Sequence, residues 1–227
     1  MISQARLFEP PVQVMDGPPV LTARVGLNAP LFADIMRLYV PEGSTVLDMT
    51  YGLGGFWNTQ GIKERYRLVT MDMELPAMVH GVLEHLPFQP ATFDCVVVDP
   101  PYANHGSTTT MLQGIASTYN LKPGNTTAHI LGMYHAALAE AAICLKKGGV
   151  AVVKCQDGIE FSRQYWIHVA VLQMAEMCGF SAEDLFVLVQ ENKPAMRHPF
   201  QRHARKNHSF FWVFQRPTQL ALMEATV

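Results

Sequence analysis

The stretch Thr45-Val46-Leu47-Asp48-Met49-Thr50-Tyr51-Gly52-Leu53-Gly54-Gly55 joins a short apolar run to a glycine-rich turn. The apolar run is typical of a strand that is buried on both faces of a parallel sheet. The glycines allow the backbone to approach a ligand at the carboxyl end of that strand, where open α/β sheets bind cofactors. This one stretch therefore predicts both the class of fold and the position of a ligand site.

Other parts of the chain repeat the alternation of apolar runs with helical periodicity. Further strands are predicted at 67–72, 93–99, 150–154, 185–190 and 209–215. Helices are predicted at 28–39, 129–145 and 165–178. The second of these is expected to end at Lys146-Lys147-Gly148-Gly149, because basic residues and glycine favour helix termination. The expected fold class is α/β: a Rossmann-like, doubly wound, mostly parallel seven-stranded sheet with a terminal antiparallel hairpin, in a single domain.

The composition, with 227 residues of which 49% are hydrophobic and 16% charged, is that of one soluble globular domain. The formal net charge is -2, so any binding to nucleic acid must be local. No apolar run reaches the ~18 residues of a membrane span and no signal peptide is evident, so we expect a cytoplasmic protein without a membrane partner. The cysteines lack CxxC spacing and are expected to be small core residues in place of zinc ligands or disulfides: Cys95, Cys144, Cys155 and Cys178.

An acidic residue, Asp72, ends the strand that follows the glycine loop, about 20 residues after the glycines. At this spacing a carboxylate can accept two hydrogen bonds from a ribose, which predicts a nucleoside cofactor. The glycines do not form GxGxxG and Asp48 opens the loop, which favours a cofactor with a cationic amino-acid end. S-adenosylmethionine fits this pattern better than NAD. A plain strand-to-helix turn capped by Asp48 is the alternative interpretation.

The segment Asp99-Pro100-Pro101-Tyr102 directly follows the apolar run 93–98. Neither proline can donate a backbone hydrogen bond, so strand pairing stops here. An exocyclic base amine is a poor nucleophile until hydrogen-bond acceptors engage its N–H groups, and the Asp99 carboxylate and Pro100 carbonyl are two such acceptors. Tyr102 offers a ring on which the base can stack. The segment predicts methyl transfer to a base amine by positioning and exclusion of water, with no metal.

In these motifs and their order, the chain resembles the S-adenosylmethionine-dependent N-methyltransferases of nucleic-acid bases. These are the DNA N6-adenine and N4-cytosine methylases and their RNA guanine-N2 relatives. The resemblance covers residues 28–216 and implies a methyltransferase domain there, between an extended proline-containing arm (1–27) and a C-terminal tail (217–227).

The resemblance also implies roles for individual residues. The implied catalytic residues are Asp99, Pro100, Pro101 and Tyr102. The implied cofactor-binding residues are Asp48, Met49, Thr50, Gly52, Gly54, Asp72, Met73, Leu86 and Asp99. The chain departs from the family at Val82, where many members have an acidic residue about four positions before the Leu-Pro-Phe run.

Recognition of nucleic acid is expected to come from loops, because no residues remain for a separate recognition domain. The segment 193–208 holds five of the 17 Lys and Arg residues and no acid, and the polar stretch 103–127 is a second candidate. A solvated hairpin loop and a simple connector are the alternatives for these two segments. The predicted substrate-binding residues are Lys193, Arg197, Arg202, Arg205, Lys206 and His208.

The most specific function predicted is methylation of adenine N6 in DNA, because the family's cytosine-N4 enzymes more often begin the motif with Ser or Thr. Cytosine N4 in DNA and guanine N2 in RNA are alternative targets, and a non-catalytic partner subunit is an alternative class. A small enzyme with one basic loop would reach a flipped base more easily on single strands, with a partner or as a homodimer.

Overall fold

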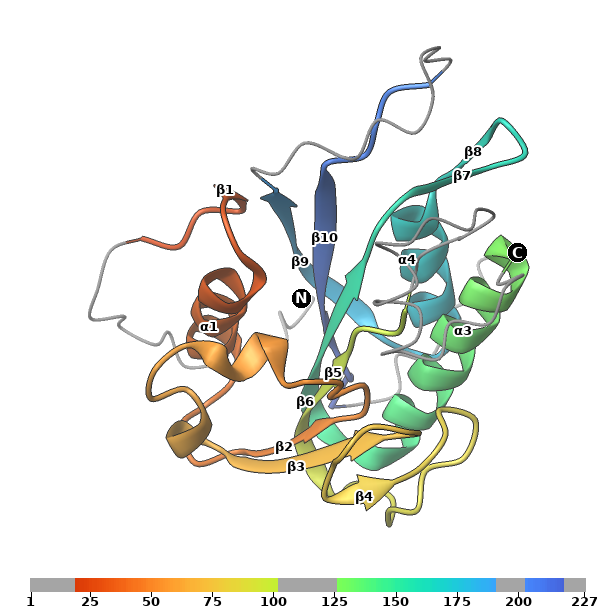
Figure 1. The fold of residues 1–227 in the computed structure, drawn as a ribbon. Helices are drawn as coiled ribbons and strands as arrows, with labels where there is room; N and C mark the ends of the chain where they lie inside the picture. Colours follow the sequence, from red (N-terminus) through yellow and green to blue (C-terminus); the bar gives the residue numbers. More distant parts are fainter. Residues whose placement is uncertain (1–18, 102–125, 191–202, 219–227) are drawn as a thin grey trace, which may run out of the picture.

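The computed structural model describes residues 19–101, 126–190 and 203–218 (Figure 1). A central sheet has the strand order β1-β9-β10-β6-β5-β2-β3-β4. Its strands are β1 (Ala23–Val25), β2 (Thr45–Asp48), β3 (Arg67–Asp72), β4 (Val79–His80), β5 (Phe93–Val98), β6 (Leu145–Cys155), β9 (Ser181–Val189) and β10 (His208–Gln215). Strand β10 is antiparallel to both β6 and β9, and the other pairings in this sheet are parallel. The expected α/β fold with a terminal antiparallel hairpin, β9–β10, is confirmed.

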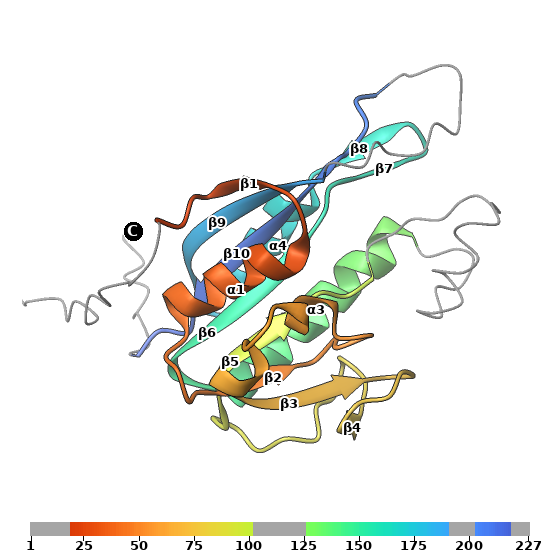
Figure 2. The same cartoon turned by 60° about the vertical axis from the view of Figure 1, so that its left-hand side comes forward.

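The two faces of the sheet are covered by helices from different parts of the chain (Figures 1 and 2). The helices are α1 (Asn28–Tyr39), α3 (Thr127–Cys144) and α4 (Ile167–Met177), with 3-10 turns at Gly55–Asn58 and Lys63–Arg65. Alternate residues of β5 serve opposite faces: Val96 and Val98 pack with α3 and α4, and Cys95 and Val97 pack with α1. Burial on both faces explains why these strands are continuously apolar in sequence.

The order in which the chain adds strands to the sheet reverses between the parallel strands β2 and β5. From β2 the chain continues outward through β3 and β4, then returns to β5 on the other side of β2 and continues to β6. In open α/β sheets such a switch point leaves a crevice at the carboxyl ends of the strands. The loops after β2 and β5, which carry the two predicted motifs, both start at this point.

The expected number of seven strands is wrong by one. The eighth strand, β1, comes from the segment predicted to be an extended arm, and it pairs in parallel with Val187–Val189 of β9. The Gly26 amide also donates to the Val189 carbonyl at 3.0 Å. Without this segment β9 would be an open edge, and backbone groups at an edge readily pair with any extended chain nearby.

The predicted helix end before Lys146-Lys147-Gly148-Gly149 is confirmed to within one residue, but the four residues belong to β6, whose start was predicted at Val150. Helix α3 ends at Cys144, and the four residues form a bulge inside β6, between the pairs Phe93–Leu145 and Cys95–Val150. Gly148 has a φ of 75°, and a Cβ on Gly149 would lie 2.9 Å from the Lys146 carbonyl oxygen. The glycines therefore serve the bulge, where only they fit without strain.

One small sheet was not predicted. Strands β7 (Gly158–Glu160) and β8 (Arg163–Tyr165) form an antiparallel hairpin between β6 and α4. The hairpin is too short to give a periodic signal in the sequence. It projects from the carboxyl end of β6, the same end at which the glycine loop and Asp99 lie.

The four cysteines are free, and three of them are fully buried: Cys95, Cys144 and Cys155. Within the described ranges there is no group of three or more His, Cys, Asp or Glu residues able to hold a metal ion. None of the helices in those ranges has the length and apolar character needed to cross a membrane.

Candidate active site

The glycine loop after β2 is held by backbone geometry that suits glycine. Gly52 and Gly54 have φ values of 56° and 72°, in the left-handed region. A Cβ on Gly54 would lie 2.6 Å from the Tyr51 hydroxyl oxygen, so a side chain there would require the Tyr51 ring to move, in addition to the unfavourable φ. The Gly52 amide donates to Asp72 Oδ2 at 3.0 Å, which joins the loop to the end of β3.

Asp72, the residue predicted to bind the ribose, also accepts hydrogen bonds from the loop that follows it. Its Oδ1 accepts from the amides of Glu74 and Leu75, at 2.9 and 2.8 Å. A carboxylate accepts about four hydrogen bonds, and these two and the Gly52 amide use three. Asp72 thus keeps one acceptor position, on Oδ2, and the second of two ribose bonds would have to replace a backbone amide.

Asp48 points into the protein, with only 2% of its surface exposed. Its carboxylate accepts from the Trp57 indole at 2.7 Å and from the Thr50 amide at 3.1 Å. Burial raises the pKa of Asp48 to about 7, while the hydrogen bonds from Trp57 and Thr50 lower the pKa. Asp48 therefore stabilises the loop from beneath, and its direct contact with a cofactor remains a prediction.

Asp99 stands at the centre of the site, directly after β5. Its backbone amide donates to Thr50 Oγ1 at 2.7 Å, so the Asp-Pro-Pro segment is bonded to the glycine loop. Its carboxylate Oδ2 lies 3.3 Å from Lys154 Nζ. The other oxygen, Oδ1, is buried and has no hydrogen-bond partner in the described structure. An unpartnered buried carboxylate oxygen is costly, which marks the atom as one that a ligand donor would satisfy.

Lys154 is a site residue that the sequence analysis did not identify. It lies on β6 beside the end of β5, and its side chain is only 3% exposed. The ammonium nitrogen also lies 5.5 Å from the ring centroid of Phe56 and 5.9 Å from that of Phe211. Burial raises the pKa of Asp99 and the nearby Lys154 charge lowers this pKa. A lysine inside the apolar run 150–155 was the available signal, because a charge in a buried strand needs a partner.

Exposed apolar side chains surround the glycine loop and the end of β3. Leu53, Met73 and Met78 are 66%, 60% and 70% exposed. Such residues beside the carboxyl ends of the strands offer an apolar surface for a planar ring. Met73 is exposed, whereas Met49 and Leu86 are 2% and 5% exposed and pack in the core; the cofactor contacts of all three stay predictions.

The remaining predicted residues divide into three groups. Pro100 is buried and Pro101 is half-buried beside Asp99. Arg205, Lys206 and His208 lie at and just before the start of β10. Four predicted residues fall outside the described part of the chain: Tyr102, Lys193, Arg197 and Arg202.

Comparisons with known proteins give matches in structure only. No protein-family model and no curated protein matches the chain. An S-adenosylmethionine-dependent methyltransferase of Methanosarcina mazei matches with a TM-score of 0.50 and 12% identity, covering 82% of this chain and 98% of that one. The chain has the methyltransferase fold.

Two further structures support the same fold. The 1,6-didemethyltoxoflavin-N1-methyltransferase of Burkholderia thailandensis matches with a TM-score of 0.50 and 14% identity, covering 82% of this chain and 76% of that one. A Bacillus halodurans protein assigned to the methyltransferases matches with a TM-score of 0.53 and 16% identity, covering 82% and 99%. At such low identity the likeness establishes the methyltransferase fold and leaves the substrate open.

The Thr50–Asp99 hydrogen bond yields a testable expectation for stability. Replacing Thr50 by Val keeps the shape of the side chain and leaves the Asp99 amide without its acceptor. We expect the free energy of unfolding, measured with urea, to fall by about 1–3 kcal/mol. Thr45→Val is the matched control at the opposite end of β2, where the hydroxyl accepts an exposed bond from Arg67. Equal stability of the two variants would show that the bond does not hold the motifs together.

Proposed function

We propose that the chain is an S-adenosylmethionine-dependent methyltransferase that modifies an exocyclic amine of a nucleic-acid base, adenine N6 in DNA being the leading target. The observation that carries this proposal is the unpartnered buried oxygen of Asp99, held next to the glycine loop. A base amine is a donor with a delocalised lone pair, and an oxygen in this state is the acceptor that it needs.

The residues at the carboxyl ends of the parallel strands fit S-adenosylmethionine. The glycine loop brings backbone amides close to a ligand, Asp72 Oδ2 retains an acceptor position for a ribose hydroxyl, and the exposed Met73 offers an apolar surface to an adenine ring. Asp99 and Asp72 supply negative charge near a ligand with a cationic amino-acid end and a sulfonium. When bound, the cofactor supplies an electrophilic methyl group.

The chemistry assigned to this chain is orientation of the amine. Asp99 Oδ1 accepts a hydrogen bond from the amine N–H, so that electron density returns to the nitrogen and its lone pair is directed away from Asp99. The Pro100 carbonyl is the proposed second acceptor. After the nitrogen has gained its methyl group it is cationic, and it loses its extra proton to solvent. Positioning of the two reactants accounts for most of the rate in a reaction of this kind.

Lys154 has a distinct role in this proposal: its charge favours the ionised form of Asp99, whose pKa burial raises overall. A buried carboxylate tends to take up a proton, and a protonated Asp99 would lose acceptor strength at the amine. The buried ammonium 3.3 Å from Oδ2 opposes this tendency and leaves Oδ1 for the substrate.

Methyl transfer can be measured with S-adenosylmethionine labelled at its methyl group, supplied with duplex DNA, single-stranded DNA or RNA. Nucleoside digestion and mass spectrometry should detect labelled N6-methyldeoxyadenosine with DNA. Label on deoxycytidine, or on guanosine in RNA, would move the target to the corresponding amine. Absence of label from every base, with S-adenosylmethionine bound, would contradict the proposal.

Asp99→Asn should abolish this transfer. The asparagine amide has one acceptor oxygen, and its NH2 group cannot accept a hydrogen bond from the substrate amine. Cofactor affinity, measured by calorimetry, should stay within about tenfold. Asp94→Asn is a matched control, since Asp94 lies at the other end of β5 and pairs with Lys146 of β6 at 2.7 Å. Full turnover by the Asp99 variant would remove this residue from the mechanism, and loss of turnover in both variants would indicate a structural effect.

Lys154→Gln should change the dependence of kcat on pH. Transfer requires ionised Asp99, so kcat falls as the pH falls through the pKa of this group. Burial raises that pKa and Lys154 lowers it, so removing the cation should move the acidic limb of the profile to higher pH. Thermal unfolding monitors the fold of the variant. A kcat reduced equally at every pH would assign Lys154 a packing role only.

A further inference from the structure

The β7–β8 hairpin exposes a large aromatic side chain at its tip. Phe161 is 90% exposed and forms, with Ser162, the two-residue turn between Glu160 and Arg163. The hairpin starts four residues after Lys154, so it leaves the sheet at the edge that bears Asp99 (Figures 1 and 2). Because the Phe161 ring is exposed, it contributes almost no hydrophobic burial to the stability of the fold.

The backbone at the tip is unfavourable for the residues it contains. Phe161 and Ser162 have φ values of 47° and 59°, in the left-handed region that turns of this kind normally fill with Asn, Asp or Gly. A bulky residue there stores strain, which persists only when surrounding contacts hold the turn. Strain together with exposure indicates that the ring serves something other than stability of the fold.

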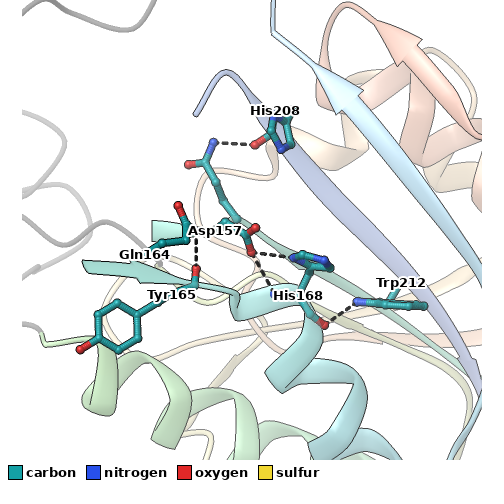
Figure 3. A network of polar contacts seen from close by, with 7 residues as sticks. Asp157, Gln164, Tyr165, His168, His208 and Trp212 are labelled. Carbon is teal, nitrogen blue, oxygen red and sulfur yellow. Dashed lines mark hydrogen bonds and ion pairs between the residues drawn. The ribbon is translucent and has the colours of Figure 1, made fainter. Parts of the chain in front are cut away.

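The base of the hairpin is anchored on two sides (Figure 3). Asp157 Oδ1 lies 2.7 Å from the His168 Nδ1 and also accepts from the His168 amide, at the start of α4. On the other side, the Gln156 side-chain amide donates to the His208 carbonyl of β10 at 2.8 Å. The Trp212 indole donates to the His168 carbonyl at 3.0 Å and completes the network. The hairpin is therefore fixed relative to the sheet edge.

Its tip is anchored as well, by the segment that precedes β10. His203 Nε2 lies 2.7 Å from the Ser162 carbonyl oxygen, which accepts the hydrogen bond. Lys206 Nζ lies 5.7 Å from the ring centroid of Trp166, whose side chain is 59% exposed. The carboxyl-terminal end of the basic segment 193–208 thus lies against the hairpin.

The hairpin and the segment 203–208 carry the cations Arg163 and Lys206 beside aromatic rings. The Arg163 guanidinium lies 5.9 Å from the ring centroid of Tyr165. The one acidic residue of the hairpin, Glu160, accepts from the Thr127 amide at the start of α3, at 3.3 Å, and so is directed at a helix N-terminus. Aromatic rings interspersed with Arg and Lys are the surface that single-stranded nucleic acids bind, through stacking and phosphate contacts.

We propose that the β7–β8 hairpin and residues 203–208 bind the single strand that carries the target base, with Phe161 stacking on an unpaired base beside it. This inference rests on the proposed function, because it assigns the substrate's neighbouring nucleotides to a surface next to Asp99. Cations at 163 and 206 contact the phosphates on either side of the stacked base. A base in an intact duplex could not stack on Phe161, so the site selects unpaired strands.

The test is binding of a fluorescein-labelled single-stranded oligodeoxynucleotide, and of the matching RNA, followed by anisotropy. Phe161→Asn removes the ring and places a residue that suits the left-handed turn. We expect affinity for the single strand to fall roughly 5- to 150-fold, as for loss of one stacked base, while the thermal midpoint stays the same or rises. Phe161→Trp should retain affinity within a fewfold.

Met177→Ala is the matched control, because Met177 is 80% exposed at the far end of α4 from the hairpin. It should leave affinity unchanged. Equal affinity of the wild-type protein and Phe161→Asn would overturn the hairpin site and leave the proposed function standing. Absence of binding of single strands and of the matching duplex alike by the wild-type protein would overturn both. If the wild-type protein binds the duplex and no single strand, and Phe161→Asn binds the duplex equally well, the hairpin site would also be overturned.

Discussion

The hydrogen bond from the Asp99 amide to Thr50 Oγ1 is the contact on which the rest of the site depends. It bridges the loops that follow β2 and β5, two neighbouring parallel strands between which the order of strand addition along the chain reverses. The Met49 amide donates to the Val97 carbonyl at 3.2 Å, and the Thr50–Asp99 bond continues this link from the paired strands into the two loops. With it, the residues proposed to hold a cofactor and those proposed to hold an amine share one rigid edge.

Three carboxylates lie near the carboxyl ends of these strands, and they differ in burial and in hydrogen-bond partners. Asp48 is buried beneath the loop and has a raised pKa, so a protonated form is accessible near neutral pH. Asp72 accepts hydrogen bonds from three backbone amides and keeps one acceptor position on Oδ2. Asp99 has a buried lysine on one oxygen and no partner on the other. We propose that this difference separates a structural acid, Asp48, from a cofactor-binding acid, Asp72, and an amine-orienting acid, Asp99.

The parts of this arrangement that follow from local sequence were predictable. Buried strands are visible as apolar runs, and the glycine loop, Asp72 and Asp99 each directly follow or end such a run. Parallel strands bring their carboxyl ends to one edge, so the meeting of these motifs could be expected before any coordinates were known.

The parts that depend on pairing between strands could not be read in this way. Lys154 reaches Asp99 because Val153 pairs with Val98, a register that no local pattern encodes. The run Lys146-Lys147-Gly148-Gly149 has the composition of a helix end, and a bulge needs the same glycines for the same reason, their freedom at positive φ. The β7–β8 hairpin carries an exposed aromatic residue at a turn position where glycine or asparagine would be expected, which hid it from turn-based reasoning.

The most direct measurement is a crystal structure with bound S-adenosylhomocysteine. The account predicts its ribose against Asp72 and its thioether sulfur between the glycine loop and Asp99, facing the unpartnered Oδ1. Binding at another edge of the sheet, or a sulfur directed away from Asp99, would contradict the proposal that this edge performs methyl transfer.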